Sequence, residues 1–181
     1  VSCPDFLPNL KAKVSGTIGI NAAHISGFAW GDWSLTKPGY LTFDFTKWKE
    51  AVDLGDIGRL SRIVIHEFTH IFNADRDSNP KYWSEFQHLA AQQGVFSSYA
   101  GRNNLETLPE VVGYYVARCA KDNPYDTGQF NDYYEWVKTT IFAGREFGPA
   151  PGTKATCDVT PEQIPTPEPS TPDWVKALSG E

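Results

Sequence analysis

Residues 56–73 have the sequence DIGRLSRIVIHEFTHIFN, and this stretch decides how the whole chain is interpreted. At 100° per residue, its apolar side chains fall within an arc of about 60–80°, which predicts one helix with a core-facing stripe. Asp56 or Asp53 can cap the start of this helix, and Asn73 can end it in the left-handed conformation. The predicted stripe consists of Ile57, Leu60, Val64, Phe68 and Ile71.

Two histidines of this helix have the spacing of a metal site. His66 and His70, in the pattern HExxH, are one turn apart and project side by side, away from the apolar stripe. From the composition of this chain, the chance expectation of that pattern is roughly 0.5%. Two neutral imidazoles at this spacing supply two of three protein ligands to Zn²⁺ and leave one position for water. Glu67, about 100° around the helix from His66, can take a proton from that water.

The third ligand must come from outside the pattern. Arg76 stands where metzincins place a ligand, and the chain lacks the methionine of their Met-turn. Asp75 and Asp77 are candidates, although both follow so closely on the helix that reaching back is awkward. Glu106 and Glu110 lie 36 and 40 residues after the second histidine, on a predicted downstream helix. The expected site is therefore of the gluzincin type, with Glu106 or Glu110 as the third ligand.

A segment further along the chain has a family resemblance. Residues 98–110, with the sequence SYAGRNNLETLPE, resemble the segment that completes the zinc site in the family of anthrax lethal factor and the Pro-Pro endopeptidases. In that family a tyrosine precedes the glutamate ligand by seven residues, and a second glutamate follows the ligand by four. Tyr99, Glu106 and Glu110 match these positions. The likeness covers about residues 60–145, in pattern more than in identity.

The resemblance implies roles for three residues. Glu106 would be the third zinc ligand, and Tyr99 would donate a hydrogen bond to the oxyanion that forms during peptide hydrolysis. Glu110 would accept a hydrogen bond from one of the histidines and fix its tautomer. Pro109 departs from the family, because a proline beyond the first turn removes a helical hydrogen bond. A later helix start, with Thr107 as cap and Glu110 reaching back to it, is the alternative.

The remaining elements predict an α+β fold. Alternating residues predict strands over 14–20 and 40–45, with an aromatic, glycine-rich loop over 27–33 between them. We expect a zincin-like metallopeptidase domain. Its small N-terminal sheet, with an edge strand, would cover the active-site helix, and its C-terminal half would be helical. Strand 40–45 would be either that edge strand, which pairs with an extended substrate, or an ordinary core strand. Further helices are predicted over 80–93, 105–120 and 131–143.

The prolines divide the chain into two parts. Seven of the thirteen lie between Pro149 and Pro172, where they favour an extended conformation. We therefore expect a metallopeptidase domain over 1–147 and a Pro-rich arm or linker over 148–181. A short helix over 171–178 is expected within that arm.

Charge and composition exclude some classes of protein. The 181 residues include 22 acidic and 16 basic side chains, so the formal net charge is −6. Nucleic-acid binding needs a cluster of cationic side chains, which this sequence lacks. A membrane-spanning helix needs about 20 consecutive apolar residues, and there is no such run. We expect a monomer that acts on a protein or peptide substrate.

Three cysteines allow at most one internal disulfide. A bond between Cys119 and Cys157 would tie the arm to the end of the helix that carries Glu106, and pairings with Cys3 are equally open. The sequence has no methionine, even at its first position, and no charged-then-apolar leader. Any signal peptide is therefore removed or not included, and the family resemblance implies a secreted, extracellular protein.

The combined features predict a zinc-dependent endopeptidase with one catalytic Zn²⁺ and Glu67 as general base. Trp30 and Trp33 would line its substrate subsites or belong to the core. Two other classes compete with this interpretation. One is a non-catalytic secreted binding module with a structural or vestigial metal site. The other is a zinc amidase that acts on cell-wall material through the same helix.

Overall fold

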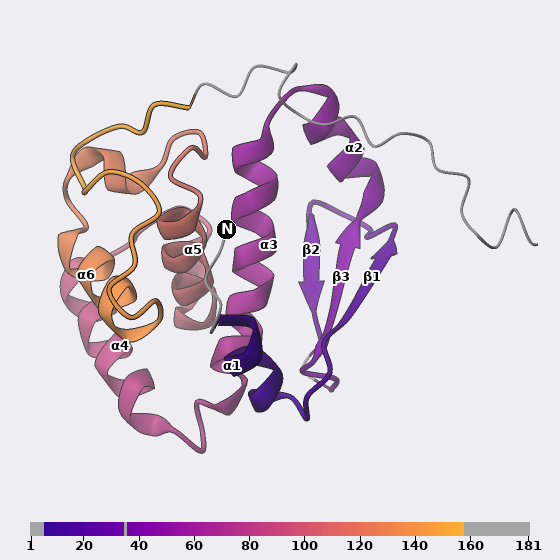
Figure 1. The fold of residues 1–181 in the computed structure, drawn as a ribbon, viewed down its shortest axis with the longest axis horizontal. Helices are drawn as coiled ribbons and strands as arrows, with labels where there is room; N and C mark the ends of the chain where they lie inside the picture. The colour runs from indigo at the N-terminus through magenta and orange to yellow at the C-terminus, as the bar shows by residue number, and fades with distance from the viewer. Residues whose placement is uncertain (1–5, 35, 158–181) are drawn as a thin grey trace, which may run out of the picture.

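The computed structural model describes residues 6–34 and 36–157, and this part of the chain has an α+β fold with six α-helices and one three-stranded sheet (Figure 1). Short 3-10 turns connect some of the helices. The elements in chain order are α1 (Phe6–Lys13), β1 (Gly19–Ala23), β2 (Gly31–Trp33), β3 (Tyr40–Asp44), α2 (Phe45–Asp53), α3 (Ile57–Phe72), η1 (Asn73–Asp75), α4 (Pro80–Gln93), η2 (Ala100–Arg102), α5 (Asn104–Val116), η3 (Pro124–Thr127) and α6 (Asn131–Thr140).

Helix α3 is the central element, with the sheet on one side and α5 on the other (Figure 1). Its predicted extent and its Asp56 cap are confirmed, since the Asp56 carboxylate accepts from the amide of Arg59 at 3.1 Å. The helix has two apolar faces where one stripe was predicted, because Ile63 packs against the sheet while Ile65 packs against the helical half. Asn73 is not left-handed: its φ of −85° and ψ of 2° lead the chain into η1.

The sheet has the order β1-β3-β2, with β1 parallel and β2 antiparallel to β3. The predicted strand over 40–45 is therefore present as β3, and it is the central strand of the sheet, so the core-strand alternative holds and the edge-strand alternative is wrong. The edge beside α3 belongs to β2, a strand of three residues inside the predicted loop. The strand predicted over 14–20 begins later, because Ser15 and Gly16 adopt positive φ angles of 63° and 84° after α1.

Asp44 joins the sheet to the loop that precedes β2. Its side chain is fully buried. One carboxylate oxygen caps α2 by accepting from the amides of Thr46 and Lys47, and the other accepts from the amide of Ile25 at 2.7 Å. The Thr46 hydroxyl also donates to this carboxylate. Its hydrogen bond, followed by those from the backbone amides, holds the pKa of Asp44 well below its usual range. Phe45 begins α2 and is exposed, so it does not share the buried face of the strand.

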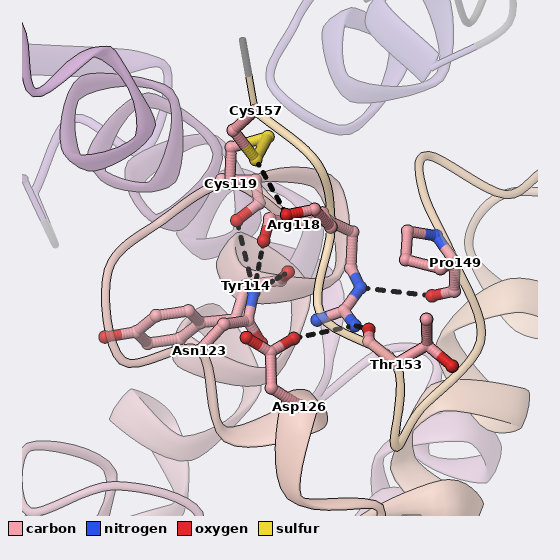
Figure 2. Close-up of a disulfide and its surroundings, with 10 residues drawn as sticks. Tyr114, Arg118, Cys119, Asn123, Asp126, Pro149, Thr153 and Cys157 are labelled. Atoms are coloured by element: carbon pink, nitrogen blue, oxygen red, sulfur yellow. Dashed lines mark hydrogen bonds and ion pairs between the residues drawn. A yellow bond between two sulfur atoms is a disulfide. The ribbon is translucent and has the colours of Figure 1, made fainter.

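The described part of the Pro-rich arm lies against the helical half. Figure 2 shows the disulfide between Cys119 and Cys157, and beside it the buried guanidinium of Arg118. Arg118 donates to the carbonyls of Pro149 and Thr153 at 3.3 and 3.1 Å. These contacts hold residues 149–157 to the body of the fold. The domain boundary at residue 147 stays a prediction. Cys3 and the expected helix over 171–178 lie outside the described residues.

The remaining predicted helices are present with small shifts at their ends. Helix α4 ends at Gly94 as expected, and α5 and α6 end a few residues earlier than predicted. Within the described ranges, no helix is both long and apolar enough to span a membrane. The two halves of the fold meet along α3, and this is where the predicted metal ligands lie.

Candidate metal centre

Helices α3 and α5 bring three predicted ligands together. Nε2 of His66 lies 3.2 Å from Oε2 of Glu106, and Nε2 of His70 lies 3.7 Å from the same oxygen. The candidate ligand atoms of the three residues all lie within 4.8 Å of one another. Zinc bonds of about 2.0–2.1 Å in a tetrahedron place ligand atoms about 3.3 Å apart. The three side chains are therefore close enough together to hold a metal ion such as Zn²⁺.

The start of α5 sets the position of Glu106. Asn103 caps the helix and its side chain accepts from the amide of Glu106 at 3.1 Å, so the alternative start at Thr107 is wrong. Pro109 lies inside the helix, where it removes one backbone hydrogen bond. Its neighbour Leu108 is fully buried in the helical core, and such burial offsets the lost bond.

Glu110 contacts the other nitrogen of His66. Its Oε1 lies 3.2 Å from Nδ1 of His66 and 2.6 Å from the guanidinium of Arg62, while its Oε2 accepts from the Ser97 hydroxyl at 2.8 Å. The alternative in which Glu110 caps its own helix is therefore wrong. A carboxylate on Nδ1 leaves the Nε2 lone pair of His66 directed to the side of Glu106. No sequence pattern indicates Arg62 and Ser97, because their role depends on a glutamate from another helix.

The other candidate ligands lie elsewhere. Asp75 is paired with Lys13, and Asp77 is largely exposed. Within the described ranges, His66, His70 and Glu106 form the only cluster of metal-ligating side chains whose ligand atoms all lie within 4.8 Å of one another.

Glu67 lies beside these ligands, against strand β2. A Cβ atom on Gly31 would lie 2.6 Å from Oε1 of Glu67, so the strand leaves room for the carboxylate only because this residue is glycine. Glu67 is 6% exposed. Burial raises its pKa to about 7, and the charges of Glu106 and Asp32 add to this while His66 opposes it. A carboxylate with a pKa near neutrality is suited to general-base chemistry.

The charges of the site favour a cation between the ligands. Burial alone would lower the pKa of His66, but hydrogen bonds to the carboxylates of Glu106 and Glu110 raise it to about 9. Burial and the neighbouring His66 lower the pKa of His70 to about 4. The two carboxylates thus attract positive charge to this position, and a divalent cation could supply that charge while both imidazoles stay neutral.

Two aromatic residues complete the surroundings. The ring of Trp33 stacks on His70 with 5.4 Å between centroids and 10° between planes, and its Nε1 donates to the carbonyl of Pro38 at 2.7 Å. The ring of Tyr99 lies 5.7 Å from that of His66. Burial raises the pKa of Tyr99 to about 12, so its phenol keeps its proton and can donate a hydrogen bond.

A cleft opens onto the centre from both sides. Two hollows of about 500 and 210 Å³ share Gly31, His66, Glu67 and Tyr99 in their walls. Trp30 lines the larger hollow and Trp33 the smaller one, although both also pack against the core near the sheet. Glu67 and Tyr99 thus line both hollows.

Comparison of the chain with models of protein families, with curated proteins and with solved structures finds no match.

Proposed function

We propose that the protein is a zinc-dependent endopeptidase of the zincin type, similar to the anthrax lethal factor and Pro-Pro endopeptidase family. His66, His70 and Glu106 would hold one Zn²⁺ ion. The observation that carries this proposal is the convergence of three ligand atoms within 4.8 Å of one another at a cleft that also contains a buried glutamate. Peptides and proteins are the proposed substrates.

The residues around the centre divide the chemistry among them. Zinc at this position would act as a Lewis acid on the substrate carbonyl and would lower the pKa of a water molecule. Glu67 accepts the proton of the attacking water and passes it to the leaving amine. Tyr99 donates its phenolic proton in a hydrogen bond to the oxygen on which negative charge develops, an interaction worth about 2–4 kcal/mol. Glu110, held by Arg62 and Ser97, keeps His66 in place.

Strand β2 offers a docking edge for the substrate. Within the described part of the chain it pairs with β3 alone, and Gly31 places its backbone beside Glu67. An extended peptide can add to a free strand edge through backbone hydrogen bonds, which give affinity with little dependence on side chains. The role foreseen for strand 40–45 is therefore proposed for β2.

The Cys119–Cys157 disulfide supports the proposal of an extracellular protein, because disulfides persist in oxidising compartments. A monomer is proposed as the working form.

The test is the variant Glu67→Gln, assayed with peptides and with cell-wall fragments side by side. We expect peptide cleavage to fall by about 10²–10⁴-fold while zinc content stays at that of the unsubstituted chain, because Glu67 is no ligand. Undiminished cleavage by Glu67→Gln contradicts the mechanism. Hydrolysis of cell-wall fragments alone indicates the zinc amidase, and a metal-loaded chain without any turnover indicates the binding module.

A further inference from the structure

Arg102 bridges the two sides of the cleft through aromatic rings. Its guanidinium carbon lies 4.5 Å from the centroid of the Tyr99 ring and 4.7 Å from that of the Phe28 ring. Tyr99 belongs to the segment before α5, whereas Phe28 belongs to the loop before β2. That loop is anchored, since the Lys47 ammonium donates to the carbonyls of Gly27 and Ala29 on either side of Phe28. Both rings line the larger hollow, so they hold the guanidinium beside that hollow.

Arg102 differs from the other arginines near the cleft in its partners. Arg59 pairs with an aspartate at 2.9 Å, Arg62 with a glutamate at 2.6 Å, and Arg76 donates to a carbonyl at 3.3 Å. The Arg102 guanidinium is exposed and lies over the two rings, and within residues 6–34 and 36–157 it makes no hydrogen bond or ion pair. Stacking uses the face of a guanidinium, so the N–H donors in its plane are free for another acceptor.

We propose that Arg102 recognises a carboxylate of the peptide substrate, a specificity that rests on the proposed function. A guanidinium presents two parallel N–H donors that match the two oxygens of a carboxylate. Tyr99, which contacts Arg102, is the residue proposed to act at the cleaved bond, and an extended peptide advances by about 3.3–3.4 Å per residue. The recognised carboxylate therefore lies within about two residues of that bond. It belongs to an acidic side chain or to the C-terminus of the substrate.

The charges around Arg102 make this specificity measurable. Glu106, Glu67 and Glu110 act on Tyr99 from the side of the centre, and the chain carries a net charge of −6, so the overall charge does not by itself favour an acidic peptide. The two rings hold the guanidinium before binding, which reduces the conformational entropy that it loses when the carboxylate arrives. A preference for a carboxylate over a neutral amide is then attributable to Arg102.

The experiment measures binding and cleavage separately. Fluorescein-labelled hexapeptides with amidated C-termini carry a single Glu, or Gln in the matched peptide, at each position in turn, and a further neutral peptide has a free C-terminus. Binding to the full zinc-loaded chain with Glu67→Gln is followed by fluorescence anisotropy. The same chain is compared after one further substitution, which is Arg102→Gln, Arg102→Lys or Lys81→Gln. Lys81 is an exposed residue of α4, so Lys81→Gln is the control that removes the same charge elsewhere.

We expect the peptide with the recognised carboxylate to bind about tenfold more tightly than its matched amide peptide. Arg102→Gln should reduce this ratio of affinities to about one. Arg102→Lys should retain part of the ratio, and Lys81→Gln all of it. An advantage confined to the free C-terminus identifies that carboxylate as the source. A ratio of one in the parent chain, or a ratio that survives Arg102→Gln, overturns the inference.

Cleavage of the same peptides by the unsubstituted chain keeps the two proposals distinguishable. Cleavage without any carboxylate preference overturns the role of Arg102 and leaves the peptidase assignment standing. An Arg102-dependent preference in binding without cleavage supports the recognition site and contradicts the peptidase.

Discussion

Replacement of Gly31 by alanine should displace Glu67 and leave the metal ligands in place. The added Cβ would lie 2.6 Å from Oε1, 2.7 Å from Cγ and 2.8 Å from Cδ of Glu67, whereas ordinary contacts begin at 3.4 Å. The carboxylate or the strand must therefore move by about 0.8 Å. A misplacement of about 1 Å in a catalytic constellation lowers the rate by about 10²-fold. We expect a loss of that order in kcat, with zinc content unchanged.

The assay for this prediction combines steady-state cleavage of a quenched fluorescent peptide with zinc analysis of the purified chain. The matched control is Gly19→Ala in β1, where the added Cβ would lie 2.7 Å from the ring of Tyr40, away from the centre. Adding Gly31→Ala to Glu67→Gln should cause no further loss, because the two changes act on the same carboxylate. A kcat of Gly31→Ala within threefold of the unsubstituted chain, or an equal loss in Gly19→Ala, refutes the reasoning.

Three further predictions concern the ligands, acid stability and the disulfide. Glu106→Ala should abolish stoichiometric zinc binding, whereas Glu110→Ala should weaken zinc affinity by only about 10–100-fold, and a competition titration with a chelator would contradict the assignment if it gave the reverse order. The pKa of Asp44 is lower in the folded than in the unfolded chain, so its contribution to stability is present above about pH 4 and disappears as the pH falls further. Asp44→Asn should therefore flatten the fall of Tm with acid, and an unchanged slope would show that Asp44 does not contribute. Replacing both Cys119 and Cys157 by alanine removes a bond that spans 38 residues and should lower the free energy of unfolding by roughly 3–4 kcal/mol in urea titrations; a loss under about 1 kcal/mol would contradict this.

The metal helix was predictable because two independent signals coincide in it. The 3.6-residue periodicity fixed its extent, and the HExxH spacing placed His66 and His70 on one side of it. The family resemblance then indicated Glu106, which the structure places beside both histidines at 3.2 and 3.7 Å. Local patterns were sufficient here because the residues involved lie within one helix or at fixed spacing in another.

The errors arose where long-range contacts decide the structure. Strand β2 has only three residues, too few for a visible alternation, and its pairing partner β3 decides that it is a strand at all. Asp44 is buried because its side chain caps α2 and binds the loop at Ile25, which a strand pattern does not reveal. No local pattern indicates the role of Gly31 either, because that role depends on Glu67 from a different element.

The position of a bound metal tests the account most directly. Crystals of the zinc-loaded chain, measured at the zinc absorption edge, give an anomalous difference map that locates the ion without reference to the protein. We expect one peak per chain, about 2.0–2.1 Å from Nε2 of His66, Nε2 of His70 and a carboxylate oxygen of Glu106. A peak at any other set of residues, or no peak between these three side chains at saturating zinc, contradicts it.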